Sequence, residues 1–573
     1  MSSATLYGVA ITIAFGAFAL YSYIQLYPRP IPGIPFNIEA TSQVLGDIPA
    51  RKAWYKSHGE VRRWYQAQCL KHNSPIAQVF INPLNGEPSV LLCDHREIRD
   101  ILMRRHGTFD RGARERQAFG ALLPEQFLSI QTPTAKFKFH RELMKDLMLP
   151  PFLNNMNAPE IFQKTMNLVQ LWQIKSRKSS GKPFDAKGDI GRATFDIIMA
   201  VAFGLDDESS CTQGQYRYTR AKDDETTNDI SSSQPAVFAT APLSAQGQAI
   251  LDLTDSIHIG VTSMLPYLHS WVALRLPPLR HAVKLKEELI RGHINAAVAG
   301  MPISNEEAQE KAKTALELLV LRERSMAQKT GRRPNYHGRY VYDQLLGYLI
   351  GGNDTTSNTL AWGLIYLADT EGPQSKLRIS LQEAFEAAVA ELRSPTVDEI
   401  LKMNVPYLEA VIEEIMRLSI VIPVVARRAT QDTTVLGHRI PKGTEVEFIM
   451  NGPGFLKPPF YVDGEQRTGT TKESPVGDWD ENDINQFVPD RWLDRKNEGQ
   501  DSFNALKGPM LTFGAGPRGC YGKRLAYMEM RIIVVLLIWH FEFLPILPNR
   551  REFGILENIT TEPSECLIRL RVL

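Results

Sequence analysis

The sequence is poor in cysteine, and its few cysteines form no pattern. Five cysteines stand far apart in 573 residues, and none belongs to a C-x-x-C pair. This spacing argues against a zinc knuckle and against a disulfide framework. Scattered thiols of this kind are typical of a protein that lives among reduced thiols.

An excess of charge of either sign is also missing. The chain has 65 Lys plus Arg against 64 Asp plus Glu, and 43% of its residues are hydrophobic. This balance excludes disordered and collagen-like classes, and it gives no overall attraction to nucleic acid. No G-x-G-x-x-G lies between a strand and a helix, so we do not expect this chain itself to bind NAD(P) or a flavin.

Basic residues are absent from the first 26 positions. Residues 4–26 are uncharged and mostly apolar, and about 20 such residues span a bilayer as a helix. Because the first charge is Arg29, the positive-inside rule places the bulk of the chain in the cytosol. We therefore predict a membrane anchor helix over residues 1–27. A cleaved signal peptide is the alternative, and the missing basic n-region disfavours it.

A proline-rich segment and a long globular region follow. Residues 28–35 contain four prolines, which cannot continue a helix, so they predict a semi-rigid hinge. We expect one large domain over residues 36–573, mainly α with minor β. The expected elements are strands at 76–81, 89–93, 541–547 and 566–572, helices at 95–105 (capped by Asp94), 189–204 and 340–370, and polar loops at 207–235 and about 462–480.

The most informative string is F-G-A-G-P-R-G-C-Y-G at residues 513–522. Its glycines allow a tight loop, and a long apolar helix is expected after Cys520. A cysteine at a helix N-terminus is favoured as a thiolate, which is a good axial ligand for haem iron. A buried structural cysteine is the alternative.

This string resembles the haem-binding loop of the cytochrome P450 family, F-x-x-G-x-R-x-C-x-G. The five fixed positions are filled by Phe513, Gly516, Arg518, Cys520 and Gly522. Leu525, Ala526 and Glu529 also look like the family's helix after the cysteine. The resemblance implies a P450-like domain with haem b as cofactor, Cys520 as the ligand of its iron, and Phe513 and Arg518 beside it.

A second string, G-G-N-D-T-T at residues 351–356, interrupts an apolar helix with residues that are poor helix formers. Residues of low helix propensity inside a helix often mark a functional site. The alternative is a helix kink whose polar groups are hydrogen-bonded to one another. The string resembles the family's oxygen-binding helix. That resemblance implies that Asp354 and Thr355 are catalytic residues which handle protons during oxygen activation.

Two further motifs concern a structural ion pair. Glu414 and Arg417 are three residues apart and share a helix face, which alone is a common surface arrangement. They resemble the family's Glu-x-x-Arg pair, about 100 residues before the cysteine. Residues 487–491 look like its meander motif, so Arg491 is expected to join Glu414 and Arg417 near the cofactor.

Other arginines are expected to contact the haem propionates. The resemblance assigns this role to Arg518 and to Arg427, with Arg428 as the nearer alternative. Arg141 matches the family's W-x-x-x-R helix motif, although Phe137 replaces the usual Trp. Any of these arginines taken alone would be an ordinary surface charge.

These matches imply a haem-thiolate monooxygenase that hydroxylates or epoxidises a lipophilic small molecule with O2. Electrons are expected from a membrane-bound flavoprotein reductase that uses NADPH, so NADPH acts only indirectly. Lys507, Arg518, Lys523 and Arg524 are candidates for its docking face. We expect a single-pass protein of the endoplasmic reticulum that faces the cytosol.

The anchor, the hinge and the motif order resemble microsomal eukaryotic members, and the insertions resemble fungal members of secondary metabolism. Two alternatives are a haem-thiolate isomerase or dehydratase, which has no need of the acid–alcohol pair, and a non-catalytic membrane haem-binding protein.

Overall fold

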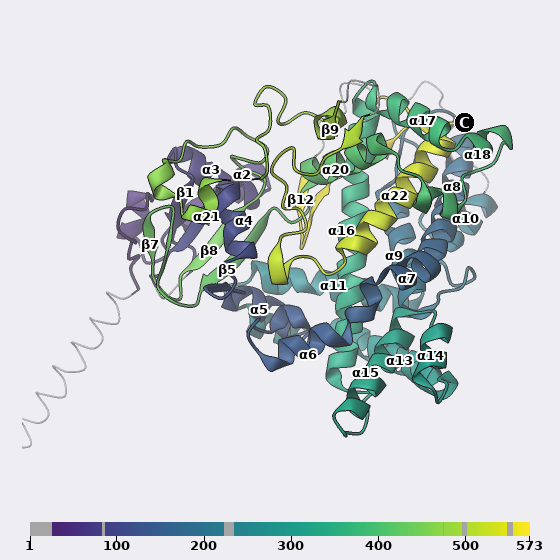
Figure 1. Ribbon diagram of the computed structural model, residues 1–573, viewed down its shortest axis with the longest axis horizontal. Helices are drawn as coiled ribbons and strands as arrows, with labels where there is room; N and C mark the ends of the chain where they lie inside the picture. Colours follow the sequence, from purple (N-terminus) through teal and green to yellow (C-terminus); the bar gives the residue numbers. More distant parts are fainter. Residues whose placement is uncertain (1–25, 83–85, 223–233, 474, 496–500, 547–553) are drawn as a thin grey trace, which may run out of the picture. The chain divides into compact units, whose positions relative to one another are not determined.

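The chain forms two compact units, each built from two separate stretches of sequence. The computed structural model (Figure 1) describes residues 26–82, 86–222, 234–473, 475–495, 501–546 and 554–573. The first unit contains the described residues up to Ala113 together with Pro423–Pro475. The second unit contains Arg114–Ile422 and Val476–Leu573. Most of the helices belong to the second unit, so the described chain is mainly α with minor β.

The first unit is organised by a five-stranded sheet of order β1-β2-β8-β5-β3. β1 (Ile76–Val79) and β2 (Ser89–Leu92) are antiparallel, and both are buried along their whole length, as expected for apolar runs. β8 (Glu445–Ile449) pairs parallel to β2. β5 (Val424–Ala429) then pairs antiparallel to β8 and to β3 (Phe109–Asp110). The two strands predicted near residues 76–93 are confirmed.

Short helices and a hairpin complete this unit. They are α2 (Ile48–His58), α3 (Arg62–Lys71), α4 (His95–Met103), α21 (Gly469–Lys472), and the hairpin of β6 (Thr433–Val435) and β7 (His438–Ile440). The Asp94 side chain accepts a hydrogen bond of 2.8 Å from the backbone N–H of Glu97. This confirms Asp94 as the N-cap of α4.

The proline-rich segment is bound to the sheet largely through one residue of β1, Gln78. Gln78 of β1 donates to the carbonyls of Ile31 (2.9 Å) and Ile34 (2.7 Å), and it accepts from the N–H of Ile31 (2.8 Å). Ile31 and Ile34 are buried. The backbone N–H of Gln78 also donates to the carbonyl of Pro35 (2.9 Å), so both the side chain and the backbone of one β1 residue hold a segment that proline keeps non-helical.

The predicted transmembrane helix is not supported. Residues 1–25 lie outside the described residues, and residues 26–35 are not helical. Among the helices that the structure describes, none is long and apolar enough to cross a membrane. The fold class is therefore corrected to a mainly helical fold without a membrane helix in its described part.

The second unit is built around α16 (Arg339–Asp369), which packs against α9 (Lys187–Phe203), α20 (Pro406–Ser419) and α22 (Lys523–His540). Figure 1 shows α16 as a long teal helix with the yellow α22 beside it. The remaining helices are α5 (Ala113–Gly120), α6 (Ala135–Leu143), α7 (Pro150–Phe152), α8 (Ala158–Lys178), α10 (Cys211–Ala221), α11 (Ala245–Thr262), α12 (Pro266–Ala273), α13 (Pro277–Gly300), α14 (Asn305–Lys311), α15 (Ala315–Lys329), α17 (Pro373–Ala384), α18 (Glu386–Ala390) and α19 (Val397–Lys402).

Four two-stranded pairs lie in the second unit. They join β4 (Phe184–Asp185) to β14 (Leu567–Ile568), β9 (Leu493–Asp494) to β10 (Ser502–Phe503), β11 (Phe541–Phe543) to β15 (Leu570–Val572), and β12 (Ile555–Glu557) to β13 (Thr561–Pro563). The predicted return to strands at the end of the chain is confirmed.

α16 runs without a break through the G-G-N-D-T-T string. Two of its glycines permit close helix packing. A Cβ at Gly352 would lie 2.5 Å from Cδ1 of Ile198 on α9, and one at Gly363 would lie 2.8 Å from Cγ2 of Ile415 on α20. The helix therefore tolerates low-propensity residues because packing against its neighbours compensates for them.

The polar loop predicted at residues 207–235 is wrong over its first half, where the structure has α10. The N-cap Ser210 accepts from the N–H of Gln213, and the Asp196 carboxylate of α9 accepts from Ser210, Cys211 and Thr212. A distant carboxylate thus satisfies the free N–H groups at the start of α10. Residues 223–233 lie outside the described residues.

Candidate active site around Cys520

Cys520 ends a glycine loop that backbone hydrogen bonds close. The N–H of Cys520 donates to the carbonyl of Phe513 (2.8 Å), and the N–H of Gly519 donates to that of Gly516 (3.0 Å). Gly514 and Gly516 have φ of 60° and 66°, which glycine adopts at low cost. The loop delivers Cys520 just before α22, whose N-cap is Gly522.

The protein groups around Cys520 have opposing effects on its charge. Burial raises the pKa of the Cys520 thiol, while the backbone N–H of Gly522, Lys523 and Arg141 lower it. The net direction is upward, so these groups alone do not complete the ionisation. A metal cation bound to the sulfur would, because a coordinating thiol loses its proton.

The residues present fit a flat cofactor at this sulfur. Protein groups crowd the Cys520 thiol, yet the residue is exposed to solvent. On α16, Gly351 is exposed although every later residue of the helix is buried or half-buried, and a Cβ there would meet no atom within 4 Å. Open space at Gly351 and a solvent-exposed thiol at Cys520 are both compatible with a bound haem.

Asp354 and Thr355 lie one helical turn beyond Gly351. The Thr355 hydroxyl donates to the carbonyl of Gly351 (2.8 Å), and Asp354 accepts from the side-chain amide of Asn353 (3.1 Å). Burial, followed by the charges of Asp255 and Glu562, raises the pKa of Asp354 to about 6. Asp354 can therefore hold and release a proton close to neutral pH.

A neighbouring acid was given no role by the sequence reasoning. Thr356 of α16 donates to Oε2 of Glu529 on α22 (2.9 Å). Glu529 is buried, its Oε1 has no hydrogen-bond partner among the described residues, and burial raises its pKa to about 8. A glutamate within the apolar run after Cys520 was the available signal. Glu529 is therefore a neutral carboxylic acid that links α22 to α16 through a hydrogen bond.

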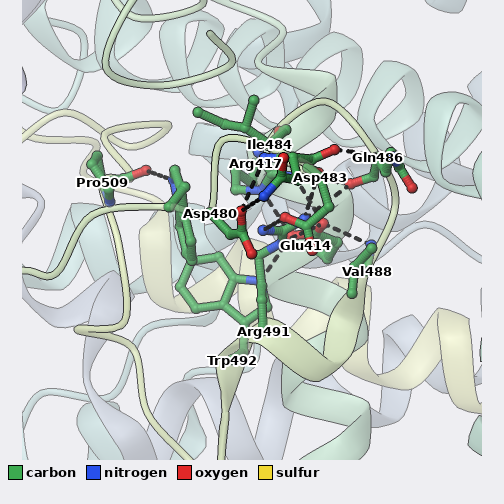
Figure 2. Close-up of polar contacts among 12 residues, drawn as sticks. Glu414, Arg417, Asp480, Asp483, Ile484, Gln486, Val488, Arg491, Trp492 and Pro509 are labelled. Atoms are coloured by element: carbon green, nitrogen blue, oxygen red, sulfur yellow. Dashed lines mark hydrogen bonds and ion pairs between the residues drawn. The ribbon is translucent and has the colours of Figure 1, made fainter. Parts of the chain in front are cut away.

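Glu414 is the centre of a buried ionic network (Figure 2). Its two carboxylate oxygens each accept a 2.8 Å bond from Arg417, and Oε1 also accepts from Nε of Arg491 at 3.0 Å. The indole N–H of Trp492 (2.9 Å) and the backbone N–H of Val488 (2.9 Å) complete the set. The structure thus brings Glu414, Arg417 and Arg491 together, and it adds Trp492, which sequence reasoning missed.

The two arginines extend this network along the chain. Arg417 donates to the carbonyls of Ile484 (2.6 Å) and Gln486 (3.0 Å), and Arg491 donates to Asp483 (2.7 Å). Thr512, just before the cysteine loop, donates to the carbonyl of Met416 (3.0 Å). Residues 483–492 and the start of the cysteine loop are therefore both fixed to α20.

Two predicted cofactor-binding arginines belong to the second unit. Arg518 is part of the cysteine loop, and Arg141 is on α6. Arg518 donates to Thr132 (2.7 Å) and to the carbonyls of Phe127 (2.8 Å) and Ile130, and its guanidinium lies 4.0 Å from the ring centroid of Phe137. Phe137, found where the family has Trp, thus offers a ring face in place of an N–H. Arg141 lies over the Tyr521 ring at 4.6 Å.

Arg427 belongs to β5 of the first unit. It donates to the carbonyl of Ala426 (2.7 Å), and Arg428 donates to that of Gly443 (2.8 Å). Contact of Arg427 with the cofactor stays a prediction.

Comparisons with known proteins agree with this geometry. The family model described as "Cytochrome P450" matches residues 62–453 and 482–564. "Cytochrome P450 monooxygenase TRI13" of Fusarium sporotrichioides is 35% identical, and the match covers 96% of this chain and 97% of that protein. "Hps1-dma1 cluster cytochrome P450 monooxygenase cyp3.1" of Dothistroma septosporum is 35% identical over 50% of this chain and 96% of its own length.

A solved structure supports the fold. "Crystal structure of a Cytochrome P450 (CYP102L1)" matches with a TM-score of 0.64 over 95% of this chain and 100% of that chain. At 18% sequence identity, this likeness concerns the fold alone.

Proposed function

This chain belongs to the cytochrome P450 family of haem-thiolate enzymes, and we propose that it hydroxylates or epoxidises a lipophilic small molecule in natural-product biosynthesis. It is a monooxygenase, and hence an oxidoreductase that uses O2. The main support for the proposal is a contact between two helices. The helix α22, which follows the cysteine loop, packs against α16, which carries Asp354 and Thr355, and Thr356 of α16 donates to Glu529 of α22.

The haem, when bound, supplies the one-electron and oxygen chemistry. We assign Cys520 as the ligand of its iron, Phe513 as a neighbour of the sulfur, and Arg141, Arg518 and Arg427 as partners of the propionates. Thr355 and Asp354 move protons, since a hydroxyl beside a carboxyl with a pKa of about 6 can pass a proton inward.

The nature of the substrate is inferred from two observations. Residues 421–425 carry four aliphatic side chains and one proline, and such side chains select apolar ligands. A similar protein is named for a gene cluster, which is the usual setting of tailoring oxidations in secondary metabolism. We therefore expect a lipophilic substrate instead of a sugar or a nucleotide.

The electrons must come from another protein. The sequence has no dinucleotide-binding fingerprint of its own. We therefore propose an NADPH-dependent flavoprotein reductase as the partner. An isomerase or dehydratase needs neither this partner nor the Asp354–Thr355 pair, so that alternative is not favoured.

The test is spectroscopic first and chemical second. Purified protein should give the reduced, CO-bound spectrum of a thiolate-ligated haem. Cys520→Ala should lose this spectrum, while Cys211→Ala, at a half-buried cysteine elsewhere in the second unit, should keep it. A host that expresses the chain with a reductase should accumulate an oxygenated lipophilic product. A thiolate-type spectrum in Cys520→Ala, or turnover without any electron donor, would contradict the proposal.

A further inference from the structure

Lys523 is held in an unusual setting for an exposed lysine. Its ammonium nitrogen lies 5.7 Å from the ring centroid of Phe513 and 5.6 Å from that of Tyr527. The two rings lie 5.3 Å apart with an angle of 36° between their planes. A cation within about 6 Å of a ring centroid is attracted to the ring face, so the side chain is restrained by two such contacts.

The rings themselves are fixed by the fold. Tyr527 is one turn beyond Lys523 on α22, and its hydroxyl donates to Oε1 of Glu413 at 2.6 Å. Glu413 is buried on α20, next to Glu414 of the ionic network. Phe513 is the first residue of the cysteine loop. The lysine is therefore restrained by groups that belong to the same rigid framework as Cys520.

This restraint keeps a positive charge beside the cysteine. Lys523 follows Cys520 by three residues and lies over the ring of Phe513, whose carbonyl accepts the N–H of Cys520 (2.8 Å). Arg524, the next residue, is directed elsewhere, since its guanidinium donates to the carbonyl of Met148 (3.1 Å). Lys523 and Arg524 are adjacent and carry the same charge, but only Lys523 is held next to the cysteine loop. Arg524 therefore serves as an internal control.

We propose that Lys523 is a positioning residue whose charge, held next to the cysteine loop by the rings of Phe513 and Tyr527, raises the potential at which the haem accepts an electron. The proposal rests on the proposed function, because it takes Cys520 as the ligand of the haem iron. A nearby positive charge disfavours the more positively charged, oxidised form of the iron. It also draws electron density from the sulfur. Both effects raise the reduction potential.

The experiment is a spectroelectrochemical titration of the purified holoprotein at fixed pH and ionic strength, without a reductase. Lys523→Met should shift the midpoint potential in the negative direction, whereas Lys523→Arg should restore most of the original value because it keeps the charge. Tyr527→Leu, which removes one of the two rings, should produce a smaller shift of the same sign. Arg524→Gln, which changes the net charge equally, should leave the potential at the original value.

Two outcomes would overturn the inference. One is an unchanged potential in Lys523→Met, and the other is an equal shift in Arg524→Gln, which would indicate a general surface-charge effect. Both outcomes are distinct from failure of the proposed function. In that case the unaltered protein itself would lack the thiolate-type spectrum, whatever residue occupied position 523.

Discussion

Thr355 and Ser357 carry hydroxyl groups on the same stretch of α16 but have different neighbours. Thr355 follows the half-buried acid Asp354 and donates to the carbonyl of the exposed Gly351, while Ser357 donates to the carbonyl of Asp354. Only the first is placed beside the open space at Gly351. The roles assigned to the two hydroxyls can therefore be separated by mutation.

We expect Thr355→Ala to retain its haem but to divert electrons from product to hydrogen peroxide. Positioned proton transfer contributes about 100-fold or more to many reactions, so product formed per NADPH should fall at least about tenfold. The measurement is the ratio of product and peroxide to NADPH consumed with the reductase present. Ser357→Ala serves as the control, and equal ratios in the two variants would contradict the role of Thr355.

Glu529 should make stability depend on pH. Its folded-state pKa of about 8 lies above the ordinary value of 4.5, so the folded protein binds the extra proton between these pH values. Its contribution is fully present below pH 4.5 and is lost as the pH rises to 8. Glu529→Gln keeps an acceptor for Thr356 and should flatten this decline. Denaturant unfolding of both proteins at pH 5 to 8 tests this, and parallel curves would refute it.

The sequence revealed some of these residues and not others. Cys520, Asp354 and Thr355 stand within strings whose composition is unusual, and for that reason they could be selected. Trp492 carries no such local mark, and Glu529 is marked only as an acid within an apolar run, because the roles of both depend on partners 78 and 173 residues away. A contact over that distance leaves no trace in local propensity.

At the scale of elements, the Glu414 network decides how α20, residues 483–492 and the cysteine loop are joined. Glu414 to Ala would leave Arg417, Arg491 and the Trp492 N–H without their shared acceptor. Loss of one partner of a buried pair costs about 3–5 kcal/mol. We expect a free energy of unfolding lower by about that amount and a reduced haem content, measured by denaturant unfolding and by absorbance.

Lys402→Ala is the matched control for this change. Lys402 pairs with Asp398 at 2.9 Å, but both side chains are more than 70% exposed. Exposed pairs contribute about 1 kcal/mol or less, so this variant should behave almost as the unaltered chain does. A comparable loss of stability in both variants would show that the Glu414 network has no special importance.

The element boundaries were predictable where a local signal existed. The apolar runs of β1 and β2 and the cap at Asp94 are local signals, and the structure has these elements within a few residues of the predicted positions. α10 is different, because its start depends on Asp196, a residue of another helix. From the sequence alone such a polar segment is predicted to be a loop, because the residue that stabilises the start of its helix belongs to a different helix.

At the scale of the whole molecule, the small net charge determines how solubility depends on pH. The net charge is +1 at pH 7 and the isoelectric point is about 7.7. Molecules with little net charge repel one another weakly, so solubility should be lowest near pH 7.7 and should rise toward pH 6 and pH 9. Light scattering of concentrated protein across this range measures the effect, and a minimum more than about one pH unit away would contradict it.

The parallel pairing of β2 with β8 has a consequence for biosynthesis. About 350 residues separate these strands along the chain, and at a translation rate of about 5–20 residues per second β8 leaves the ribosome roughly 20–70 s after β2. During that interval the nascent hairpin of β1 and β2 exposes an apolar edge that no later strand yet covers. Slower elongation between codons 93 and 445 should therefore lengthen this exposure and increase the demand for chaperones.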